Sequence, residues 1–271
     1  MSAGFQSRRA PLLLSVYAFL VYAFLYFPII VLVVYSFNGS GVGGFPPAHW
    51  TVDWYHQLFM DAALWDAVLN SVIVAAVAVA IALGLGLPAA LALDRTDFPG
   101  KALFRRLVLL PLILPGIITG LSLLMLFVAV GMKLSLVTIT LGHGTALISV
   151  ATTEIFAGLQ KLERVQEEAS LDLGAKRSTT FRRVVIPLTW PGIVAGMVLV
   201  FVPAMGNFVA PTLIGGGKDL YLSTLLAQSF LMARDWPFGS AVATFLSLIV
   251  VLSLLILAFT DRRSAAQGKS A

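Results

Sequence analysis

Long apolar stretches alternate with shorter polar segments along the whole of this chain. Six stretches reach the roughly 20 residues that a helix needs to cross the hydrocarbon core of a bilayer. We expect them at about residues 12–36, 66–93, 104–131, 136–159, 187–213 and 240–260. Because open strands cannot satisfy their backbone polar groups in lipid, the pattern predicts an all-α integral membrane protein with six transmembrane helices. We expect a single transmembrane domain over residues 1–271.

Composition excludes several classes of protein. Hydrophobic residues make up 59% of the chain and charged residues 11%, which is too little charge to cover a soluble surface. The absence of cysteine excludes disulfides, thiolate metal sites and a cysteine nucleophile. The three histidines, His49, His56 and His143, have no partner at metal-ligand spacing, and no P-loop pattern is present. We therefore expect no enzyme activity, no metal and no cofactor in this chain.

The distribution of basic residues predicts the orientation in the membrane. Fifteen of the 18 Lys and Arg residues, among them Arg8 and Lys269, precede the first stretch, follow the last, or lie in alternate loops between. Only Lys133, Lys218 and Arg234 lie in the other loops. Because cytoplasmic loops carry the excess of Lys and Arg, both termini and the loop at about 160–186 are predicted to be cytoplasmic.

The two longer outside loops are predicted to carry short helices of their own. In the loop at 37–65, the aromatic part from Trp50 onward favours an amphipathic helix at the membrane surface. In the loop at 214–239, three consecutive glycines at 215–217 are expected to end the fifth span. The apolar run 220–232 that follows is too short for a confident crossing and predicts an outside helix or a re-entrant segment.

The cytoplasmic loop at 160–186 is unusual because it is both charged and patterned. Its apolar residues recur at helical spacing over 162–173, and Gly174 then favours the end of a helix. Ser178 or Thr179 is expected to cap a second helix, and Pro187 suits the first turn of the next span. A plain solvated connector does not explain apolar residues in such a loop, so we expect it to dock against a partner.

Several residues within or beside the spans are candidates for a solute pathway. Pro115 predicts a kink or hinge in the third span, although a packing kink has the same signature. Glu154 is the one acid well inside a predicted span, where it would attract a cation or pair with an arginine near the interface. Asn207 is expected to bridge helices or touch the solute. Outside, Asp235 and Trp236 offer a carboxylate and an aromatic face for a cation.

The spacing within the cytoplasmic loop resembles the EAA loop of permease subunits of bacterial ATP-binding-cassette (ABC) importers. An acidic-small-small triplet at Glu168-Ala169-Ser170 is followed by Gly174 and then by Val184-Val185-Ile186-Pro187. The resemblance implies that the loop docks into a groove of a cytoplasmic ATPase. The residues that it assigns to this coupling are Glu167, Glu168, Ala169, Asp172, Gly174, Ala175 and Pro187. ATP and Mg would be bound by that partner, not by this chain.

Further stretches are similar to spermidine/putrescine permeases. They are Tyr26-Phe27-Pro28-Ile29-Ile30, residues 201–216, and Arg234-Asp235-Trp236-Pro237-Phe238-Gly239. The resemblance implies a MetI-like fold with its core at about 66–260, in the bacterial inner membrane. It also implies three partners: a second permease subunit, an ATPase dimer and an extracytoplasmic binding protein. The N-terminal stretch resembles one polyamine permease and the 201–241 stretch the other, which leaves open which half this chain represents and whether it pairs with itself.

The function that we expect is therefore half of a translocation pathway for a small solute, most simply a polyamine. Opines, amino-acid derivatives and ferric iron remain alternatives, since selectivity in such importers lies largely in the binding protein. A secondary transporter would more often show an inverted repeat and several ionisable groups inside the membrane. A membrane-embedded enzyme would need a catalytic set, and none is evident in the sequence.

Overall fold

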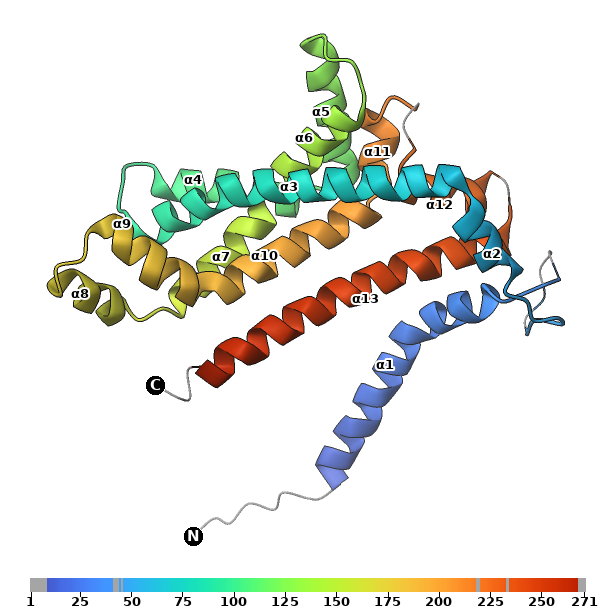
Figure 1. The fold of residues 1–271 in the computed structure, drawn as a ribbon, viewed down its shortest axis with the longest axis horizontal. Coiled ribbons are helices and arrows are strands. Elements are labelled where there is room, and N and C mark those ends of the chain that lie inside the picture. Colours follow the sequence, from blue (N-terminus) through green and yellow to red (C-terminus); the bar gives the residue numbers. More distant parts are fainter. Residues whose placement is uncertain (1–8, 41–43, 45, 218–219, 233, 268–271) are drawn as a thin grey trace. The chain divides into compact units, whose positions relative to one another are not determined.

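The fold is helical throughout the part of the chain that the structure describes. The computed structural model describes residues 9–40, 44, 46–217, 220–232 and 234–267, with side chains from residue 14 to residue 255. The helices are α1 (Arg9–Tyr35), α2 (Asp53–Met60), α3 (Ala62–Arg95), α4 (Lys101–Ile113), α5 (Gly116–Ala129), α6 (Leu136–Ala146), α7 (Ile148–Gln160), α8 (Arg164–Asp172), α9 (Arg177–Thr180), the π-helix η1 (Phe181–Val185), α10 (Ile186–Gly206), α11 (Val209–Ile214), α12 (Leu222–Leu231) and α13 (Trp236–Gln267) (Figure 1). Among these residues an isolated β-bridge between Asn38 and Trp50 is the one strand-like pairing.

The chain divides into two compact units, residues 1–60 with 228–246 and residues 61–227 with 247–271. In the first unit, the loop after α1 is fixed to α2 by polar contacts. Trp54 Nε1 donates to the Asn38 carbonyl at 2.8 Å, and the hydroxyls of Ser36 and Tyr55 lie 2.6 Å apart. The aromatic segment that follows Trp50 therefore forms a short helix, as the sequence predicts.

The core of the second unit is a pairwise packing of α3, α7 and α10. The side of α3 that faces this core is lined with small residues, including Ala78, Ala82 and Gly86, which are all buried. A Cβ added at Gly86 would lie 3.0 Å from the Ala151 Cβ and 3.1 Å from the Thr152 backbone nitrogen of α7. Small residues let helix backbones approach closely, which is the main source of packing energy between helices in a membrane.

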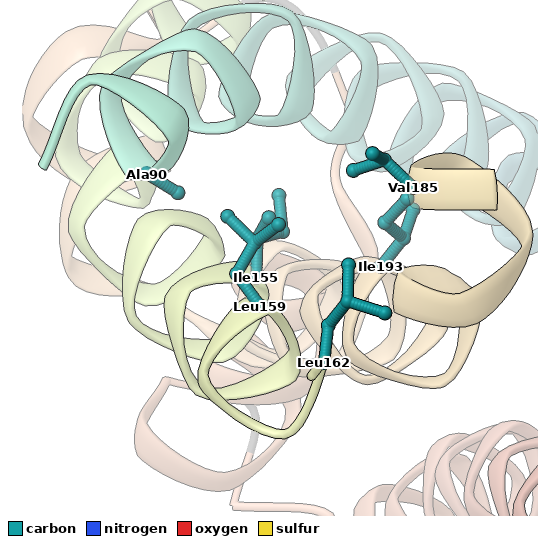
Figure 2. Packing of buried hydrophobic residues seen from close by; sticks show 6 residues of the cluster. All are labelled: Ala90, Ile155, Leu159, Leu162, Val185 and Ile193. Atoms are coloured by element: carbon teal, nitrogen blue, oxygen red, sulfur yellow. The ribbon is translucent and has the colours of Figure 1, made fainter. Parts of the chain in front are cut away.

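A cluster of buried apolar side chains joins these three helices to both ends of the loop at 160–186 (Figure 2). Leu162 begins the loop and Val185 ends it, and both pack with Ala90, Ile155, Leu159 and Ile193. The loop between them is thus anchored at its two ends in the helix core and does not hang free.

The third predicted span is broken where the sequence predicts a kink. Helices α4 and α5 meet at an angle of 108° with Leu114 and Pro115 between them. Leu114 has an extended backbone (φ −77°, ψ 134°) because the ring of a following proline disfavours the helical conformation. The predicted kink or hinge at Pro115 is therefore confirmed, and the stretch 104–131 forms two helices.

The fifth span also ends earlier than the sequence predicts. Helix α10 stops at Gly206, and the glycines at 215–217 follow a separate short helix, α11. Pro211 has no N–H to donate to the carbonyl of Asn207, so a continuous helix would leave that carbonyl unpaired. Ser223 Oγ instead donates to it at 2.8 Å. The expectation that the triple glycine ends the span is therefore wrong.

Five helical segments within the described residues are long and apolar enough to cross a membrane, and the bent pair α4–α5 makes a sixth if it counts as one crossing. The five are Leu14–Tyr35, Ala62–Arg95, Leu136–Gln160, Arg177–Gly206 and Trp236–Leu255. Helix α12 is a short apolar helix at the predicted position. Of the residues used for the predicted orientation, Arg8, Lys218 and Lys269 lie outside the described residues.

Candidate functional site

Helix α8 and the turn that ends it form the centre of the candidate site. The Gly174 N–H donates to the Leu171 carbonyl at 2.9 Å, and the Ala175 N–H donates to the Ser170 carbonyl at 3.2 Å. This pair of bonds is the Schellman motif, which requires a left-handed residue just after the helix. Gly174 has φ +84°, so the sequence correctly predicts that a glycine ends this helix.

Helix α8 presents one continuous exposed face, which we call the outer face of α8. Positions i, i+3, i+4 and i+7 share a side of a helix. Here they are Val165, Glu168, Ala169 and Asp172, and all four are exposed. Val165 is 67% exposed, and Leu173, just after the helix, is 89% exposed. The outer face of α8 and the residue that follows the helix thus leave two large apolar side chains and two carboxylates open to solvent.

The opposite face of α8 is tied to the end of α3 by an ion pair. The Arg95 guanidinium donates to both carboxylate oxygens of Glu167, one of these bonds measuring 2.6 Å. The Arg95 Nε lies 2.8 Å from an Asp94 carboxylate oxygen, and Arg164 of α8 donates to the Asp94 carbonyl at 3.3 Å. Bidentate pairing fixes orientation as well as distance, so α3 sets the direction in which α8 points.

A second contact ties α8 to the helix that follows it. The hydroxyls of Ser170 and Thr180 lie 3.0 Å apart, and Thr180 is buried. Between the ion pair and this contact lies a cavity of about 400 Å³, lined by Leu91, Arg95, Glu167, Leu171, Arg177, Thr180, Phe181 and Val185. Polar contacts across a cavity, together with the anchored ends of the loop, therefore hold α8 in place.

The second helix of the loop begins and continues differently from the prediction. Lys176 occupies the capping position of α9 and makes no side-chain cap bond, so the predicted cap at Ser178 or Thr179 is wrong. The Thr179 and Thr180 N–H groups bond instead to the Lys176 carbonyl. From α9 the chain passes through η1 directly into α10, where Pro187 is exposed within the first turn, as predicted. Single π-turns inside longer helices occur frequently at functional sites.

Apart from Pro187 in α10, the residues assigned to coupling lie in α8 and its cap, and those within α8 divide between its two sides. Glu168, Ala169 and Asp172 lie on the outer face, whereas Glu167 points to α3 and is partly buried. Ala175 is half-buried and closes the cap of the helix. Sequence reasoning missed Arg95, which is 72 residues from Glu167 and carries no local signal of its pairing.

The candidate pathway residues are dispersed. Pro115 lies at the exposed break between α4 and α5, and Glu154 lies half-buried in α7. Glu154 forms no ion pair within the described part of the chain, so the arginine partner considered above is not observed. Asn207 joins α10 to its neighbours, because its side-chain oxygen accepts from the Ala210 N–H at 3.3 Å while Ser223 bonds to its carbonyl.

Asp235 and Trp236 belong to the other unit of the chain. Asp235 Oδ1 accepts from the Phe238 N–H at 3.2 Å, at the start of α13. Trp236 is 54% exposed, and its ring packs edge-on against Phe230 with 5.4 Å between the ring centroids. Both groups have a local structural role, and the indole keeps much of its surface free.

Comparison with known proteins shows which family has this loop and these helices. Residues 82–264 match the family described as the inner membrane component of binding-protein-dependent transport systems. The chain belongs to this family. It is a MetI-like permease subunit of an ABC importer and a multi-pass protein of the inner membrane, as the sequence predicts. The matched region contains the whole of α7, α8 and α10, the cap of α8, and the end of α3 that carries Arg95.

Curated relatives of this permease cover most of its length. The spermidine/putrescine transport system permease protein PotC of Haemophilus influenzae is 32% identical over 91% of this chain and 94% of its own. The putrescine transport system permease protein PotI of Escherichia coli K12 is 35% identical over 82% of this chain and 81% of its own. The spermidine/putrescine transport system permease protein PotB of Salmonella typhimurium SL1344 is 46% identical, but over 38% of this chain and 36% of its own.

Solved structures share the fold of this permease at low sequence identity. A bacterial ABC transporter for import of the acidic polysaccharide alginate has a chain with a TM-score of 0.69 and 16% identity, covering 95% of this chain and 94% of that one. A chain of the MetNI methionine ABC transporter, in an inward-facing conformation, has a TM-score of 0.64 and 19% identity, covering 76% of this chain and 97% of that one. These matches establish the fold of the permease.

Proposed function

We propose that this permease forms half of the translocation pathway of an ATP-driven importer of polyamines, with putrescine and spermidine as substrates. The assignment of polyamines as substrates rests on the similarity to two polyamine permeases, at 32% and 35% identity over most of the chain. The other half is a second permease subunit or a second copy of this chain. An extracytoplasmic binding protein delivers the solute, and a cytoplasmic ATPase dimer binds ATP and Mg.

In this proposal the chain crosses the membrane six times, with the bent pair α4–α5 as one crossing and both termini in the cytoplasm. The support is the excess of basic residues in one set of alternate loops, because such loops face the cytoplasm. Helix α8 then lies on the cytoplasmic side, where an ATPase has access to it. The loop with Lys133 and the segment with α12 lie outside.

The outer face of α8 docks into the ATPase. Glu168 contributes a polar contact, and Gly174 contributes shape, since no atom of the chain lies within 4 Å of where its Cβ would be. A movement of the docked α8 passes to α3 through the Arg95–Glu167 ion pair. It passes to α7 and α10 through the buried cluster that contains Leu162 and Val185. The loop thus moves as a rigid body and switches the pathway between inward-open and outward-open states.

The pathway itself offers few groups to a polycation. Glu154 is a half-buried carboxylate without an ion-pair partner in the described residues, which suits attraction of an ammonium group. In the other unit, Asp235 and the exposed indole of Trp236 offer the solute a carboxylate and an aromatic face. Pro115 gives the hinge between α4 and α5, and Asn207 joins α10 to α11 and α12. The small number of such groups agrees with selection of the solute mainly by the binding protein.

Uptake of labelled putrescine and spermidine tests the function. Cells that lack this protein are complemented with wild type or with Gly174→Asp, and membrane insertion of both is measured on blots. We expect wild type to restore uptake, and Gly174→Asp to insert normally without restoring it. Wild type that inserts but restores neither polyamine would refute the substrate, and failure of Gly174→Asp to insert would point to a folding role for the glycine.

A further inference from the structure

A basic pocket lies at the start of α4, away from the site described above. It has a volume of about 430 Å³ and is lined by Leu93, Lys101, Ala102, Arg105, Arg106 and Phe156. The pocket combines three basic side chains with the apolar ends of α3 and α7. A smaller adjoining cavity of about 60 Å³ shares Arg105, Phe156 and Leu93 and reaches Thr152 and Thr153.

Both arginines of this pocket carry uncompensated charge, and Arg105 is also positioned by an aromatic ring. Arg105 lies over the ring of Phe156, with 5.6 Å from its guanidinium carbon to the ring centroid. Neither Arg105 nor Arg106 forms an ion pair among the described residues, and both are exposed. A cation that is positioned by an aromatic face and lacks a carboxylate is available to an external anion.

One carboxylate lies nearby, and it neutralises only the third cation. Lys101 Nζ donates to Asp97 Oδ1 at 2.9 Å, and this bond lowers the pKa of the Asp97 carboxyl, which stays ionised. The pocket therefore keeps the two positive charges of Arg105 and Arg106. In addition, α4 begins at Gly100 without a side-chain cap, so the positive end of its helix dipole adds to the attraction for an anion.

An apolar stripe leads away from the pocket along the same helix. Leu103, Leu107 and Leu110 follow one another at i, i+4 and i+7 and are 61%, 57% and 43% exposed. Arg106 is three residues after Leu103 and four before Leu110, so its side chain borders both the stripe and the pocket. A soluble anion such as free phosphate has no apolar part to contact this stripe, whereas a phospholipid has both a charged headgroup and acyl chains.

We propose that the pocket binds the headgroup phosphate of an anionic phospholipid, whose acyl chains lie along Leu103, Leu107 and Leu110. Arg105 and Arg106 bind the phosphate oxygens, for which the planar guanidinium is well suited. The proposal uses only one part of the proposed function, namely that α4 begins at a membrane interface, and it does not depend on the transported solute. In the proposed topology α4 begins at the cytoplasmic side, before the break at Pro115. The bound lipid would hold this end of α4 in place.

The test measures binding of phosphatidylglycerol relative to phosphatidylcholine. The full-length protein is reconstituted in phosphatidylcholine vesicles with small amounts of spin-labelled lipid of either kind, and the relative association constant is determined for each variant. Arg105→Gln/Arg106→Gln removes the two charges. Lys133→Gln/Arg234→Gln is the matched control, because it removes the same charge from exposed residues of the opposite loops. Arg105→Lys/Arg106→Lys keeps the charge and tests whether the helix tolerates substitution.

We expect the wild type, the control and the lysine variant to prefer phosphatidylglycerol. In Arg105→Gln/Arg106→Gln the preference should fall by roughly 30-fold, about fivefold for each basic side chain near an anionic surface. An unchanged preference in this variant, or an equal loss in the control, would overturn the proposal. Loss of the wild-type preference on adding inorganic phosphate would identify a site for free phosphate. If the variant keeps its lipid but no longer copurifies with the ATPase, the patch is a protein-docking surface and the lipid proposal is wrong.

Discussion

At the scale of single residues, the two neighbouring glutamates of α8 have different environments. Glu167 is bound to Arg95 at the end of α3, whereas Glu168 is exposed on the opposite side of the helix. The sequence motif places both in a coupling segment but does not say which one faces the partner. The structure shows which one is open to solvent, because consecutive helical residues are about 100° apart and Glu167 is turned toward α3. In the proposed mechanism Glu168 contacts the ATPase and Glu167 passes the movement on.

Breaking the Arg95–Glu167 ion pair should loosen the loop without preventing insertion. Arg95→Gln leaves the partly buried Glu167 without its partner, at a cost of about 1–2 kcal/mol at this degree of exposure, whereas Glu167→Gln leaves Arg95 beside Asp94 and should cost less. We expect reduced polyamine uptake and faster trypsin cleavage within the loop for either variant. The exchanged pair Arg95→Glu/Glu167→Arg should recover part of both. Equal uptake and cleavage in all four proteins would show that the ion pair plays no part in coupling.

Substitutions of Gly174 should distinguish its two proposed roles, which are to adopt the left-handed backbone conformation and to leave room for the ATPase. Gly174→Ala strains the left-handed conformation at φ +84° by about 1–2 kcal/mol, whereas asparagine adopts it more easily. Within this chain both side chains have open space. We therefore expect Gly174→Asn to insert normally yet to retain less ATPase during copurification than wild type. Full retention of the ATPase by Gly174→Asn would show that the glycine is needed only for its backbone conformation and not to make room for the ATPase.

At the scale of elements, the crossing of α7 and α10 determines how the loop is supported. Gly158 and Gly192 face each other there, and a Cβ at Gly192 would lie 2.9 Å from both the Gly158 Cα and the Glu154 carbonyl oxygen. The loop leaves α7 just after this crossing and enters α10 just before it. The close contact therefore makes the two helices one rigid support for the loop.

Gly192→Ala should separate these helices, because the atoms that its methyl group meets are backbone and cannot rotate away. We expect a loss of about 1–3 kcal/mol of stability, measured as a lower midpoint of thermal unfolding in detergent, together with lower uptake. Gly84→Ala is the matched control. It lies in α3 with no atom within 4 Å of the added Cβ, so it should be neutral or gain up to about 1 kcal/mol from helix propensity. Equal changes in the unfolding midpoint and in uptake for Gly192→Ala and Gly84→Ala would contradict a close contact between α7 and α10.

The elements also show how far the sequence alone predicts this structure. The helical loop, its end at Gly174 and the break at Pro115 depend on local chemistry of glycine and proline, and they were correctly predicted. The end of α10 at Gly206 was not, because besides Pro211 it involves a hydroxyl of another helix, Ser223 of α12, that bonds to the freed carbonyl of Asn207. The Arg95–Glu167 pair was missed for the same reason. Contacts between segments far apart in the sequence leave no periodic pattern in either one.

At the scale of the whole molecule, the orientation in the membrane determines which partner can reach which surface. The chain has no cysteine, so single cysteines can be introduced without a background. Ser178→Cys lies in the cytoplasmic loop of the proposed topology and Lys133→Cys lies outside, and both positions are exposed. A membrane-impermeant maleimide should label Lys133→Cys in intact cells, and Ser178→Cys only after the cells are opened. The reverse pattern would invert the topology and place α8 out of reach of a cytoplasmic ATPase.

The most direct test of the central claim is accumulation of labelled putrescine in right-side-out membrane vesicles that contain the whole transporter and are supplied with its binding protein. We predict accumulation with wild type only when ATP is enclosed in the vesicles, and none with Gly174→Asp under the same conditions. Accumulation that needs no ATP and follows an ion gradient would contradict the account, because the energy would then not enter through α8.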